Sequence, residues 1–332
     1  MKSASGAGIS RILVTGAGGF IGRHLVAFLV EEGYQVVGLD QRFPAGLHGQ
    51  DRLRLLVGDF RDLQEMDKLL DGIEIVIHLA SAHLQIATNQ ETYWGINVHG
   101  LGPFLEIASR KGVQRFVHVS SVGVYGNIKT DEAHEDSPCD PQSLYGKTKL
   151  AGENIVREFG RKTGFPVVII RPAWVFGTYC PRTLKLYKAL QKGRFIMIGK
   201  GSNGRHPLYI KDMLQAFKLS LDANEALGQT FLIAGPSALT TSKLVETMCE
   251  VANLPFPKIR IPYWVGFAMG LGFEATFKMM GKEPPLSRRS LEFFDTHNAF
   301  SIDKARNVLG FNPAYSFESG FLECLEWLKV HG

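Results

Sequence analysis

In the first half of the chain, short hydrophobic runs alternate with longer stretches in which hydrophobic positions recur at helical spacing. The short runs are rich in Val, Ile and Leu, and most of them end before Gly, Asp or Ser, which is typical of buried strands that stop at turns. Strands that alternate with helices form a parallel sheet with helices on both faces. We therefore expect an α/β fold with a doubly wound parallel sheet. The expected strands are 11–14, 35–39, 53–57, 73–81, 115–119 and 166–170.

Beyond residue 177 the alternation loosens. We expect helices at 184–192 and 241–253 and a strand at 231–235. Residues 264–273 are uncharged and strongly apolar, but they supply only about half of the ~20 residues that a membrane-spanning helix needs. We therefore expect that they do not cross a bilayer. Three alternatives stay open for them: a buried core helix, the wall of an apolar pocket, or contact with a membrane surface.

The composition is that of an ordinary globular protein, with 45% hydrophobic and 21% charged residues among 332. The formal net charge of +5 is slight, and no long run of Lys or Arg is present. We therefore expect no nucleic-acid partner, whereas an anionic small molecule is easily accommodated. Residues 1–10 lack the apolar core of a signal peptide, so we expect a flexible tail and a cytoplasmic protein.

Four cysteines are widely scattered and show no metal-ligand spacing. This pattern predicts free structural thiols, no bound metal and a reducing compartment. They are Cys139, Cys180, Cys249 and Cys324.

A glycine-rich turn follows the first expected strand directly and leads into the first expected helix, at 24–32. The sequence Thr15-Gly-Ala-Gly-Gly-Phe-Ile-Gly22 gives the order strand, glycine turn, helix that the pyrophosphate of a dinucleotide requires. Gly16 allows the tight turn, Gly19 allows close approach to the backbone, and Gly22 lets the helix pack on the strand. We expect the phosphates over the N-terminus of this helix.

Further candidates follow the next three strands. Asp40 ends the second strand about 20 residues beyond the glycine turn, where a carboxylate bonds the adenosine ribose and repels a 2′-phosphate. NAD is therefore favoured, while the neighbouring Arg42 keeps NADP open. Asp59 can hold the adenine amino group. The small residues of Leu79-Ala-Ser81 suit a backbone that lies against a cofactor.

The stretch Ser143-Leu-Tyr-Gly-Lys-Thr-Lys149 carries the candidate catalytic pair. If it forms the first turns of a helix, Tyr145 and Lys149 lie four residues apart on one face. A free tyrosine titrates near pH ~10, so a nearby ammonium is needed to stabilise its phenolate near neutral pH. Such a phenolate can act as a general base. His78, by contrast, is expected to be a packed residue rather than a catalytic one.

Together these motifs resemble those of the extended short-chain dehydrogenase/reductase family, also called the NAD-dependent epimerase/dehydratase family. The resemblance implies a Rossmann-type NAD-binding domain at 11–178, to which 207–235 returns. It also implies a smaller, discontinuous C-terminal substrate-binding domain at 179–206 and 236–332, and a return towards the sheet within 195–212. The matching residues are Thr15 to Gly22, Asp40, Asp59, His78 to Ser81, Asn97, Ser120, Ser121, Tyr125, Gly126, Tyr145, Lys149, Arg171 and Pro172.

The resemblance also implies roles for individual residues. Tyr145 would take the proton of a substrate hydroxyl, and Lys149 would lower the pKa of Tyr145 and bind the nicotinamide ribose. Ser121 would hydrogen-bond the substrate oxygen. The residues expected to bind NAD are Gly16, Gly19, Phe20, Ile21, Gly22, Asp40, Asp59, Phe60, Leu79, Ala80, Ser81, Asn97, Tyr145, Lys149, Pro172 and Val175. Those expected to contact the substrate are His83, Ser121, Trp174 and Arg205.

Two positions bear on the kind of substrate. Many nucleotide-sugar members of the family have Asn in place of Trp174, so the indole suggests an apolar wall, unless it is simply a core residue. Arg205 stands where some of those members present an arginine to a diphosphate; the alternative is an exposed loop arginine. The segments 283–286 and 299–313 resemble the 3β-hydroxysteroid dehydrogenase branch of the family.

These features predict an NAD-dependent oxidoreductase that transfers a hydride between a secondary alcohol carbon and nicotinamide, with a hydrophobic, sterol-like alcohol as the leading substrate. A nucleotide-sugar 4-epimerase or dehydratase is the alternative, although Val122 and Gly123 lack the Glu usual near the catalytic Ser of a dehydratase. A non-catalytic NAD-sensing protein is a third alternative, which the complete set of catalytic residues disfavours. By family analogy we expect a homodimer and a small-molecule substrate. Peripheral membrane contact stays open.

Overall fold

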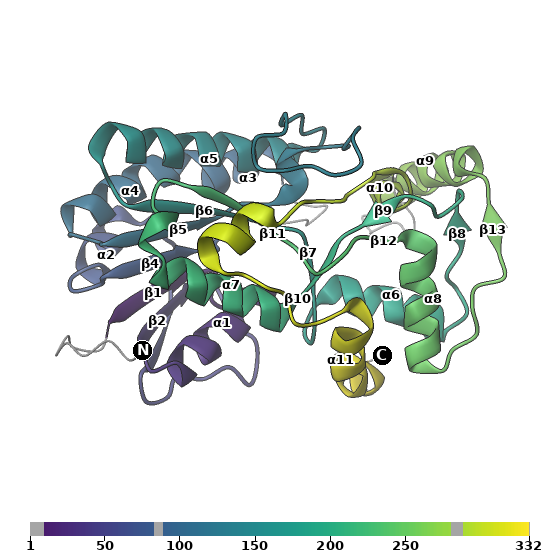
Figure 1. The fold of residues 1–332 in the computed structure, drawn as a ribbon, viewed down its shortest axis with the longest axis horizontal. Coiled ribbons are helices and arrows are strands. Elements are labelled where there is room, and N and C mark those ends of the chain that lie inside the picture. Colours follow the sequence, from purple (N-terminus) through teal and green to yellow (C-terminus); the bar gives the residue numbers. More distant parts are fainter. Residues whose placement is uncertain (1–9, 83–88, 280–287, 332) are drawn as a thin grey trace.

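A seven-stranded parallel sheet forms the larger part of the molecule (Figure 1). The computed structural model describes residues 10–82, 89–279 and 288–331. Along the sheet the strand order is β11, β6, β5, β4, β1, β2, β3, so the order reverses between β1 and β4, the place where such sheets bind their ligands. The strands are β1 Arg11–Thr15, β2 Gln35–Asp40, β3 Leu53–Val57, β4 Ile75–His78, β5 Arg115–Val119, β6 Val167–Pro172 and β11 Thr230–Ile233.

Helices cover both faces of this sheet. On one face, α1 (Phe20–Glu31) and α7 (Ile210–Asp222) bury their apolar sides in a common core with β1 and β6. On the other face, α2 (Leu63–Leu69), α4 (Leu101–Arg110) and α5 (Leu144–Thr163) form a second core. Between β4 and α4 lie α3 (Gln90–Trp94) and the π turn η1 (Gly95–His99); short 3-10 turns occur at η2 (Val122–Val124) and η3 (Asn224–Ala226).

Short strand pairs and helices form the opposite end of the molecule (Figure 1). They enclose a third core that is rich in Phe and Leu. The pairs are β7 (Trp174–Phe176) with β10 (Pro207–Tyr209), β8 (Met197–Ile198) with β13 (Arg260–Ile261), and β9 (Gly204–Arg205) with β12 (Leu239–Thr240). The helices are α6 (Pro181–Gln191), α8 (Thr241–Ala252), α9 (Tyr263–Met279), α10 (Arg288–Asp295) and α11 (Phe317–His331), and the π turn η4 (Ala305–Leu309) lies between α10 and α11.

The predicted fold class is confirmed, and the predicted strands 53–57 and 115–119 coincide with β3 and β5. Two expectations need correction. The first helix begins at Phe20 rather than at residue 24, because Gly19, the last residue of the turn, is already its N-cap. The strands within 195–212, β8, β9 and β10, pair with other short strands outside the seven-stranded sheet. Of the strands after β6, β11 at Thr230–Ile233 is the one that joins that sheet among the described residues. Gly199 and Gly201 have positive φ angles of 71° and 67°, so this segment cannot form one long strand.

The apolar stretch predicted at 264–273 lies in α9, but a buried core helix is the wrong interpretation. Its inward positions are Gly266 and Gly270, which are buried, and a Cβ on Gly266 would lie 2.8 Å from Ile198 Cγ2. The large side chains therefore lie on the outer side, where Trp264 is 72% exposed. Within the described ranges, no helix combines the length and the apolarity needed to cross a membrane. All four cysteines are free thiols, as expected.

Candidate active site

The strand order arranges the predicted cofactor residues along one edge of the sheet. Because all neighbouring strands of the sheet are parallel, their carboxyl ends meet at this edge. From β3 towards β6 the edge presents Asp59, Asp40, Gly16, the Leu79–Ser81 segment, Ser121 and Pro172. The residues predicted for the adenosine end thus lie on one side of the glycine turn, and those predicted for the nicotinamide end lie on the other.

The glycine turn fits a pyrophosphate. Gly16 has a φ of 75° and donates its N–H to Leu39 O at 2.8 Å, which holds the turn against β2. A Cβ on Gly22 would lie 2.1 Å from Gly16 O, so α1 can approach this closely only with glycine there. The N-terminus of α1 has no side-chain cap and no acidic residue in its first turn, so its backbone donors and dipole suit an anion.

Asp40 is held at the edge beside this turn. Its Oδ2 accepts a 2.9 Å hydrogen bond from Gly18 N, and its Oδ1 accepts a 3.3 Å hydrogen bond from Arg42 N. A Cβ on Gly18 would lie 2.2 Å from Arg42 O, so glycine is needed for this close packing. The carboxylate is thereby fixed where the ribose of a dinucleotide is expected.

The carboxylate of Asp59 already has hydrogen-bond partners within the protein, which the sequence does not indicate. Its carboxylate accepts hydrogen bonds from Arg61 Nη2 at 2.6 Å and from Gln41 Nε2 at 2.8 Å. Its hydrogen bonds with Arg61 are the main cause that lowers the pKa of Asp59 to about 2. The ring of the next residue, Phe60, is buried against His78, with centroids 4.7 Å apart. Phe60 therefore reaches the edge only through its backbone.

The end of β4 is tied to the glycine turn and to α5. A 2.8 Å hydrogen bond joins Thr15 Oγ1 and His78 Nδ1, and Ala80 N donates to the same Thr15 oxygen at 3.3 Å. His78 is buried, and burial lowers its pKa to about 3, so it is a packed neutral histidine, as predicted. A Cβ on Gly16 would lie 2.8 Å from Ala80 N, which shows how closely β4 approaches the turn.

Asn97 links two parts of the edge. Its Oδ1 accepts hydrogen bonds from Ala82 N at 2.8 Å and from Ser81 Oγ at 3.0 Å, and its Nδ2 donates to Thr148 Oγ1 at 3.0 Å. Thr148 Oγ1 in turn donates to Tyr145 O at 3.0 Å. The carboxamide thus connects the residues after β4 with the helical turn that carries Tyr145. The sequence pattern did not single out Thr148.

Tyr145 and Lys149 lie one turn apart near the start of α5, on one face as predicted. The helix is capped by Ser143, whose Oγ accepts from Gly146 N at 3.1 Å. A Cβ on Gly146 would lie 2.4 Å from Gly123 O, so glycine lets this turn pack directly on η2. A Cβ on Gly123 would in turn lie 3.4 Å from Ser121 Oγ and 3.8 Å from Tyr145 ring carbons. The structure therefore brings Ser121 and Tyr145 together.

Lys149 is buried at the end of β5. Its Nζ donates a 2.6 Å hydrogen bond to Val119 O, and burial lowers its pKa to about 8. The rings of His78 and His118 are stacked at 5.7 Å, and the charge of Lys149 adds to the burial that lowers the pKa of both. The cation is therefore surrounded by neutral groups on the sheet side. Among the described residues, Ser120 Oγ and both ring nitrogens of His118 are buried without a hydrogen-bond partner. Ser120 belongs to the matching motif residues, whereas His118 was not predicted, because a strand pattern does not reveal which buried polar side chains lack partners.

A buried ion pair supports the same helix. Arg171 Nη2 lies 2.7 Å from Glu153 Oε2, and both side chains are almost completely buried. Arg171 Nη1 also donates to Tyr125 Oη at 2.6 Å. This network joins β6 and α5. Arg171 and Tyr125 belong to the predicted motifs, whereas Glu153 lies in none of them and was not predicted.

Trp174 and Arg205 lie in the other part of the molecule. The indole packs against the rings of Phe293 and Phe317, with centroids 6.4 and 6.2 Å apart, at the border of the third core, and we call these three rings the aromatic wall. Arg205 is 7% exposed, and its guanidinium donates to Phe293 O and Thr296 Oγ1 at 3.0 and 3.1 Å. The exposed-loop alternative for Arg205 is therefore wrong. The predicted His83 lies outside the described residues.

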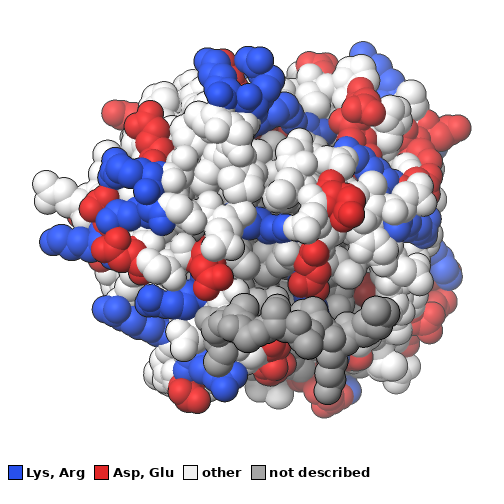
Figure 2. All heavy atoms as spheres, turned by 60° about the vertical axis from the view of Figure 1, so that its left-hand side comes forward, with Lys and Arg blue, Asp and Glu red and all other residues white. Residues whose placement is uncertain are grey.

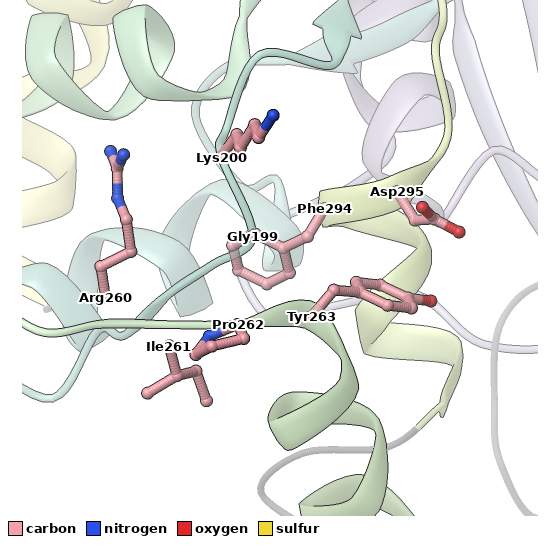
Figure 3. A pocket seen from close by; sticks show the side chains of 8 residues that line it. All are labelled: Gly199, Lys200, Arg260, Ile261, Pro262, Tyr263, Phe294 and Asp295. Carbon is pink, nitrogen blue, oxygen red and sulfur yellow. The ribbon is translucent and has the colours of Figure 1, made fainter.

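A pocket of about 630 Å³ opens between β8, β13, α9 and α10. Figure 3 shows Lys200 and Arg260 extending to one side of the backbone of residues 260–262, while Ile261 extends to the other. None of its lining residues was predicted as a site residue. They are Gly199, Lys200, Arg260, Ile261, Pro262, Tyr263, Phe294 and Asp295. Phe294 stacks edge-on against Phe293 at 5.1 Å, so α10 connects this pocket with the Trp174 wall.

The sequence profile described as "NAD dependent epimerase/dehydratase family" matches residues 12–234. The structure resembles that of DesIV, a dTDP-glucose 4,6-dehydratase from Streptomyces venezuelae solved with NAD and TYD bound, with a TM-score of 0.80 and 26% identity over 96% of this chain and 97% of that one.

Two curated relatives differ in the substrates that their names print. An N-acetyl-alpha-D-glucosaminyl-diphospho-ditrans,octacis-undecaprenol 4-epimerase of Escherichia coli O157:H7 is 28% identical over 96% of this chain and 96% of the relative. A 3 beta-hydroxysteroid dehydrogenase/Delta 5-->4-isomerase of Mycobacterium tuberculosis is 28% identical over 96% and 90%. The names of these proteins thus print a lipid-linked sugar and a steroid, while that of DesIV prints a nucleotide sugar, and all three match the chain over nearly its whole length.

Proposed function

The chain belongs to the NAD-dependent epimerase/dehydratase family, and from this premise we propose that it transfers a hydride between NAD and a secondary alcohol carbon of a hydrophobic substrate. It is an NAD-dependent enzyme of the extended short-chain dehydrogenase/reductase type. When bound, NAD supplies the carbon that accepts the hydride. All other steps belong to side chains and backbone groups of the protein.

The cofactor would be held by the residues along the sheet edge. The backbone of the glycine turn and the N-terminus of α1 would hold the pyrophosphate. Asp40 would bond the adenosine ribose, and Asp59 would lie at the adenine end. Pro172 and Val175, at β6 and β7, would offer backbone to the nicotinamide end. We accordingly assign NAD binding to 11–178 and 207–235 and substrate binding mainly to 179–206 and 236–332.

Proton transfer would be carried out by Tyr145. As a phenolate it accepts the proton of the substrate hydroxyl, and the ammonium of Lys149 one turn away stabilises that phenolate. Ser121 Oγ donates to the substrate oxygen as it becomes a carbonyl. The observation that carries this proposal is the buried Lys149, whose position is fixed by Val119 O at 2.6 Å while Tyr145 on the same face is only partly buried.

The surroundings of Trp174 support an apolar substrate. The indole joins Phe293 and Phe317 in an aromatic wall, and aromatic side chains bind apolar rings and chains well. The steroid dehydrogenase relative is compatible with this wall. A hydrophobic alcohol with a secondary hydroxyl is therefore the leading substrate.

A sugar 4-epimerase is the second candidate. Lys200 and Arg260 in the pocket beside α10 are cations of the kind that bind a diphosphate, and one relative is named as the 4-epimerase of a sugar diphosphate of undecaprenol. An undecaprenol is itself a long apolar chain, so this candidate also fits the aromatic wall. An epimerase returns the hydride to the same substrate and therefore releases no NADH.

The experiment that tests the proposal measures both NADH and product. Purified protein with NAD is offered 3β-hydroxysterols, UDP-sugars and a polyprenyl-diphosphate sugar. A dehydrogenase forms NADH in proportion to the alcohol consumed, whereas an epimerase converts the sugar with no net NADH. Loss of either activity in Tyr145→Phe ties it to the proposed site. If no secondary alcohol of any of these classes reacts, the proposed function is wrong.

A further inference from the structure

Two histidine rings bridge segments that lie far apart in the chain. His206 follows β9 directly, and His297 lies two residues after the end of α10. Each ring makes one hydrogen bond through each of its two nitrogens, and all four partners are backbone groups. Neither histidine takes part in the proposed hydride and proton transfer, so their contacts need another explanation.

His297 joins β9 to the segment 127–131. Its Nδ1 accepts a 3.0 Å hydrogen bond from Gly204 N, and its Nε2 lies 3.0 Å from Asp131 O. The backbone N–H of His297 donates to Asn127 Oδ1 at 3.2 Å. A Cβ on Gly204 would lie 2.7 Å from His297 Cε1, so the ring rests directly on the backbone of β9.

His206 ties the same strand to the chain just after His297. Its Nδ1 accepts from Phe300 N at 3.2 Å, and its Nε2 lies 2.9 Å from Gly235 O. The backbone oxygen of His206 accepts from Trp174 N at 3.2 Å. The ring is 5% exposed, and burial lowers its pKa. His206 is therefore a buried, neutral anchor.

The backbone partners fix the protonation state of both rings. A backbone N–H can only donate, so the Nδ1 that accepts from it carries no proton. The proton of the neutral ring is then on Nε2, which donates it to Asp131 O in one case and to Gly235 O in the other. A second proton, on Nδ1, would set two N–H groups against each other and break the contact with Gly204 or Phe300.

The two contacts hold surfaces that are expected to border the substrate. Arg205, between Gly204 and His206, donates its guanidinium N–H to Phe293 O, and Phe293 belongs to the aromatic wall. On the other side of His297, the segment 127–131 begins three residues after η2, the turn that Ser121 caps. His297 therefore connects the expected substrate-binding surface with the chain next to the expected catalytic residues.

The two rings differ in the charges around them. His297 is partly exposed, whereas for His206 the charged residue within two positions of the ring and its partners is Arg205, which opposes a second cation. Figure 2 shows Lys and Arg interspersed with Asp and Glu over the face that it draws, so we expect no large field of one sign from that face. Within two positions of His297 and its partners lie the acidic Asp131, Glu132 and Asp295, the basic Lys129 and Arg205, and the uncharged Tyr125 and His206.

We propose that His297 is a positioning residue: its neutral ring holds the segment 127–131 against β9, and a proton taken up by the ring releases this contact and loosens the substrate side of the site. The buried His206 keeps β9 anchored in both states. Because the contact needs the neutral ring, it is lost as the pH falls. The effect on the reaction rests on the proposed function; the contact and its release do not.

Hydrogen–deuterium exchange of the full chain, without substrate, tests the release. It is measured by mass spectrometry at about pH 8 and about pH 5, on either side of the ordinary histidine titration, and corrected for intrinsic exchange rates. The reporting amides are those of Gly204, His297 and Asn298, which donate to His297 Nδ1, Asn127 Oδ1 and Gly204 O. We expect their protection to fall at least about tenfold at the lower pH, while peptides from β5 and β6 keep theirs.

Three variants separate the proton from the contact. His297→Asn keeps an acceptor oxygen near the position of Nδ1 but cannot titrate there, so protection should be kept at both pH values. His297→Leu removes the acceptor, so protection should be lost at both. His134→Asn is the matched control, because His134 is exposed and lies three residues beyond the segment; it should behave as the wild type. NAD binding by all three variants should equal that of the wild type, which shows that they are folded.

Kinetics test the link to the reaction, with the 3β-hydroxysterol or sugar nucleotide that the protein turns over. Between about pH 8 and about pH 5, KM of the wild type should rise about tenfold more than KM of His297→Asn, whereas the change in kcat should be the same in both. An equal rise of KM in both would overturn the link to the substrate.

Three results would overturn the role of His297: equal protection of the wild type at both pH values, the same loss in His297→Asn as in the wild type, or loss of the pH dependence in His134→Asn. If no substrate reacts, the proposed function and the link to the reaction fall together. The exchange result stands in that case, because it needs no turnover.

Discussion

The ammonium of Lys149 donates a 2.6 Å hydrogen bond to the carbonyl oxygen of Val119, the last residue of β5. This contact joins the second turn of α5 to the carboxyl edge of the sheet. Since Tyr145 lies one turn earlier on the same face of α5, its phenol is held beside the same edge. The cation thus has a structural partner as well as its proposed role in catalysis.

Replacing Lys149 by Met should stabilise the protein at pH 7 and abolish turnover. Burial lowers the pKa of Lys149 from 10.5 to about 8, which corresponds to a cost of about 3 kcal/mol for the buried cation at neutral pH. The lost hydrogen bond to Val119 offsets part of this gain, so we expect a net increase of about 1–2 kcal/mol. Chemical denaturation measures the change, and Lys147→Met, exposed on the same helix, should change little.

The same substitution should remove part of the pH dependence of stability. Between pH of about 8 and 10.5 the unfolded chain holds the proton that folded Lys149 has lost. The free energy of unfolding of the wild type therefore rises with pH across this window. In Lys149→Met that rise should be smaller. An identical pH profile in wild type and variant would show that Lys149 keeps its ordinary pKa.

Replacing Tyr145 by Phe should reduce kcat by ~10²–10⁴-fold while NAD still binds, because only the proton acceptor is removed. Steady-state kinetics and an NAD titration measure the two effects separately. Tyr34→Phe, remote from the sheet edge, is the matched control and should retain activity. Undiminished kcat in Tyr145→Phe would refute the proton-transfer role.

Replacing Asp40 by Asn should narrow the preference for NAD over NADP by about tenfold, because the negative charge that repels a 2′-phosphate is lost. The Asn oxygen can still accept the hydrogen bond that Gly18 N makes at 2.9 Å, so the glycine turn is kept. The ratio of kcat/KM for the two cofactors measures the effect. Asp51→Asn, at an exposed position, should leave the ratio unchanged; an unchanged ratio in Asp40→Asn as well would mean that Asp40 does not select the cofactor.

Replacing Arg171 by Met should destabilise the fold by about 3 kcal/mol, because it leaves the buried Glu153 with only the longer, 3.3 Å contact to the partly exposed Arg157. The side chains of Arg171 and Glu153 lie 2.7 Å apart with 3% and 0% of their surfaces exposed. The double variant Arg171→Met, Glu153→Leu should recover most of this loss, since no buried charge is left unpaired and Arg157 is partly exposed to water. Equilibrium unfolding of the wild type and the two variants checks the pair; equal stability of the single and double variants would contradict it.

Replacing Gly22 by Ala should lower the free energy of unfolding by about 1–3 kcal/mol and weaken NAD binding, because its Cβ would lie 2.1 Å from Gly16 O. Gly102→Ala in α4 is the control: nothing lies within 4 Å of that Cβ, so the helix should gain about 0.5–1 kcal/mol. Thermal unfolding and an NAD titration compare the two variants. Normal NAD affinity in Gly22→Ala would show that this close packing is dispensable.

Features that depend on neighbours in the chain could be predicted from the sequence. The strand at 53–57, the glycine turn after β1 and the helical spacing of Tyr145 and Lys149 are local, because strand and helix periods and the freedom of glycine act over a few residues. The order of these motifs was sufficient to predict the sheet, the cofactor and the edge at which the candidate site lies.

Only the tertiary structure decided the features that join distant residues. Arg205 is buried because Phe293 in α10 and Thr296 just after it, 88 and 91 residues later in the chain, supply Phe293 O and Thr296 Oγ1. Lys149 is buried by β5, and the large side chains of α9 are exposed because Gly266 packs on Ile198. Burial is set by what packs against a residue, and periodicity within one element does not contain that information.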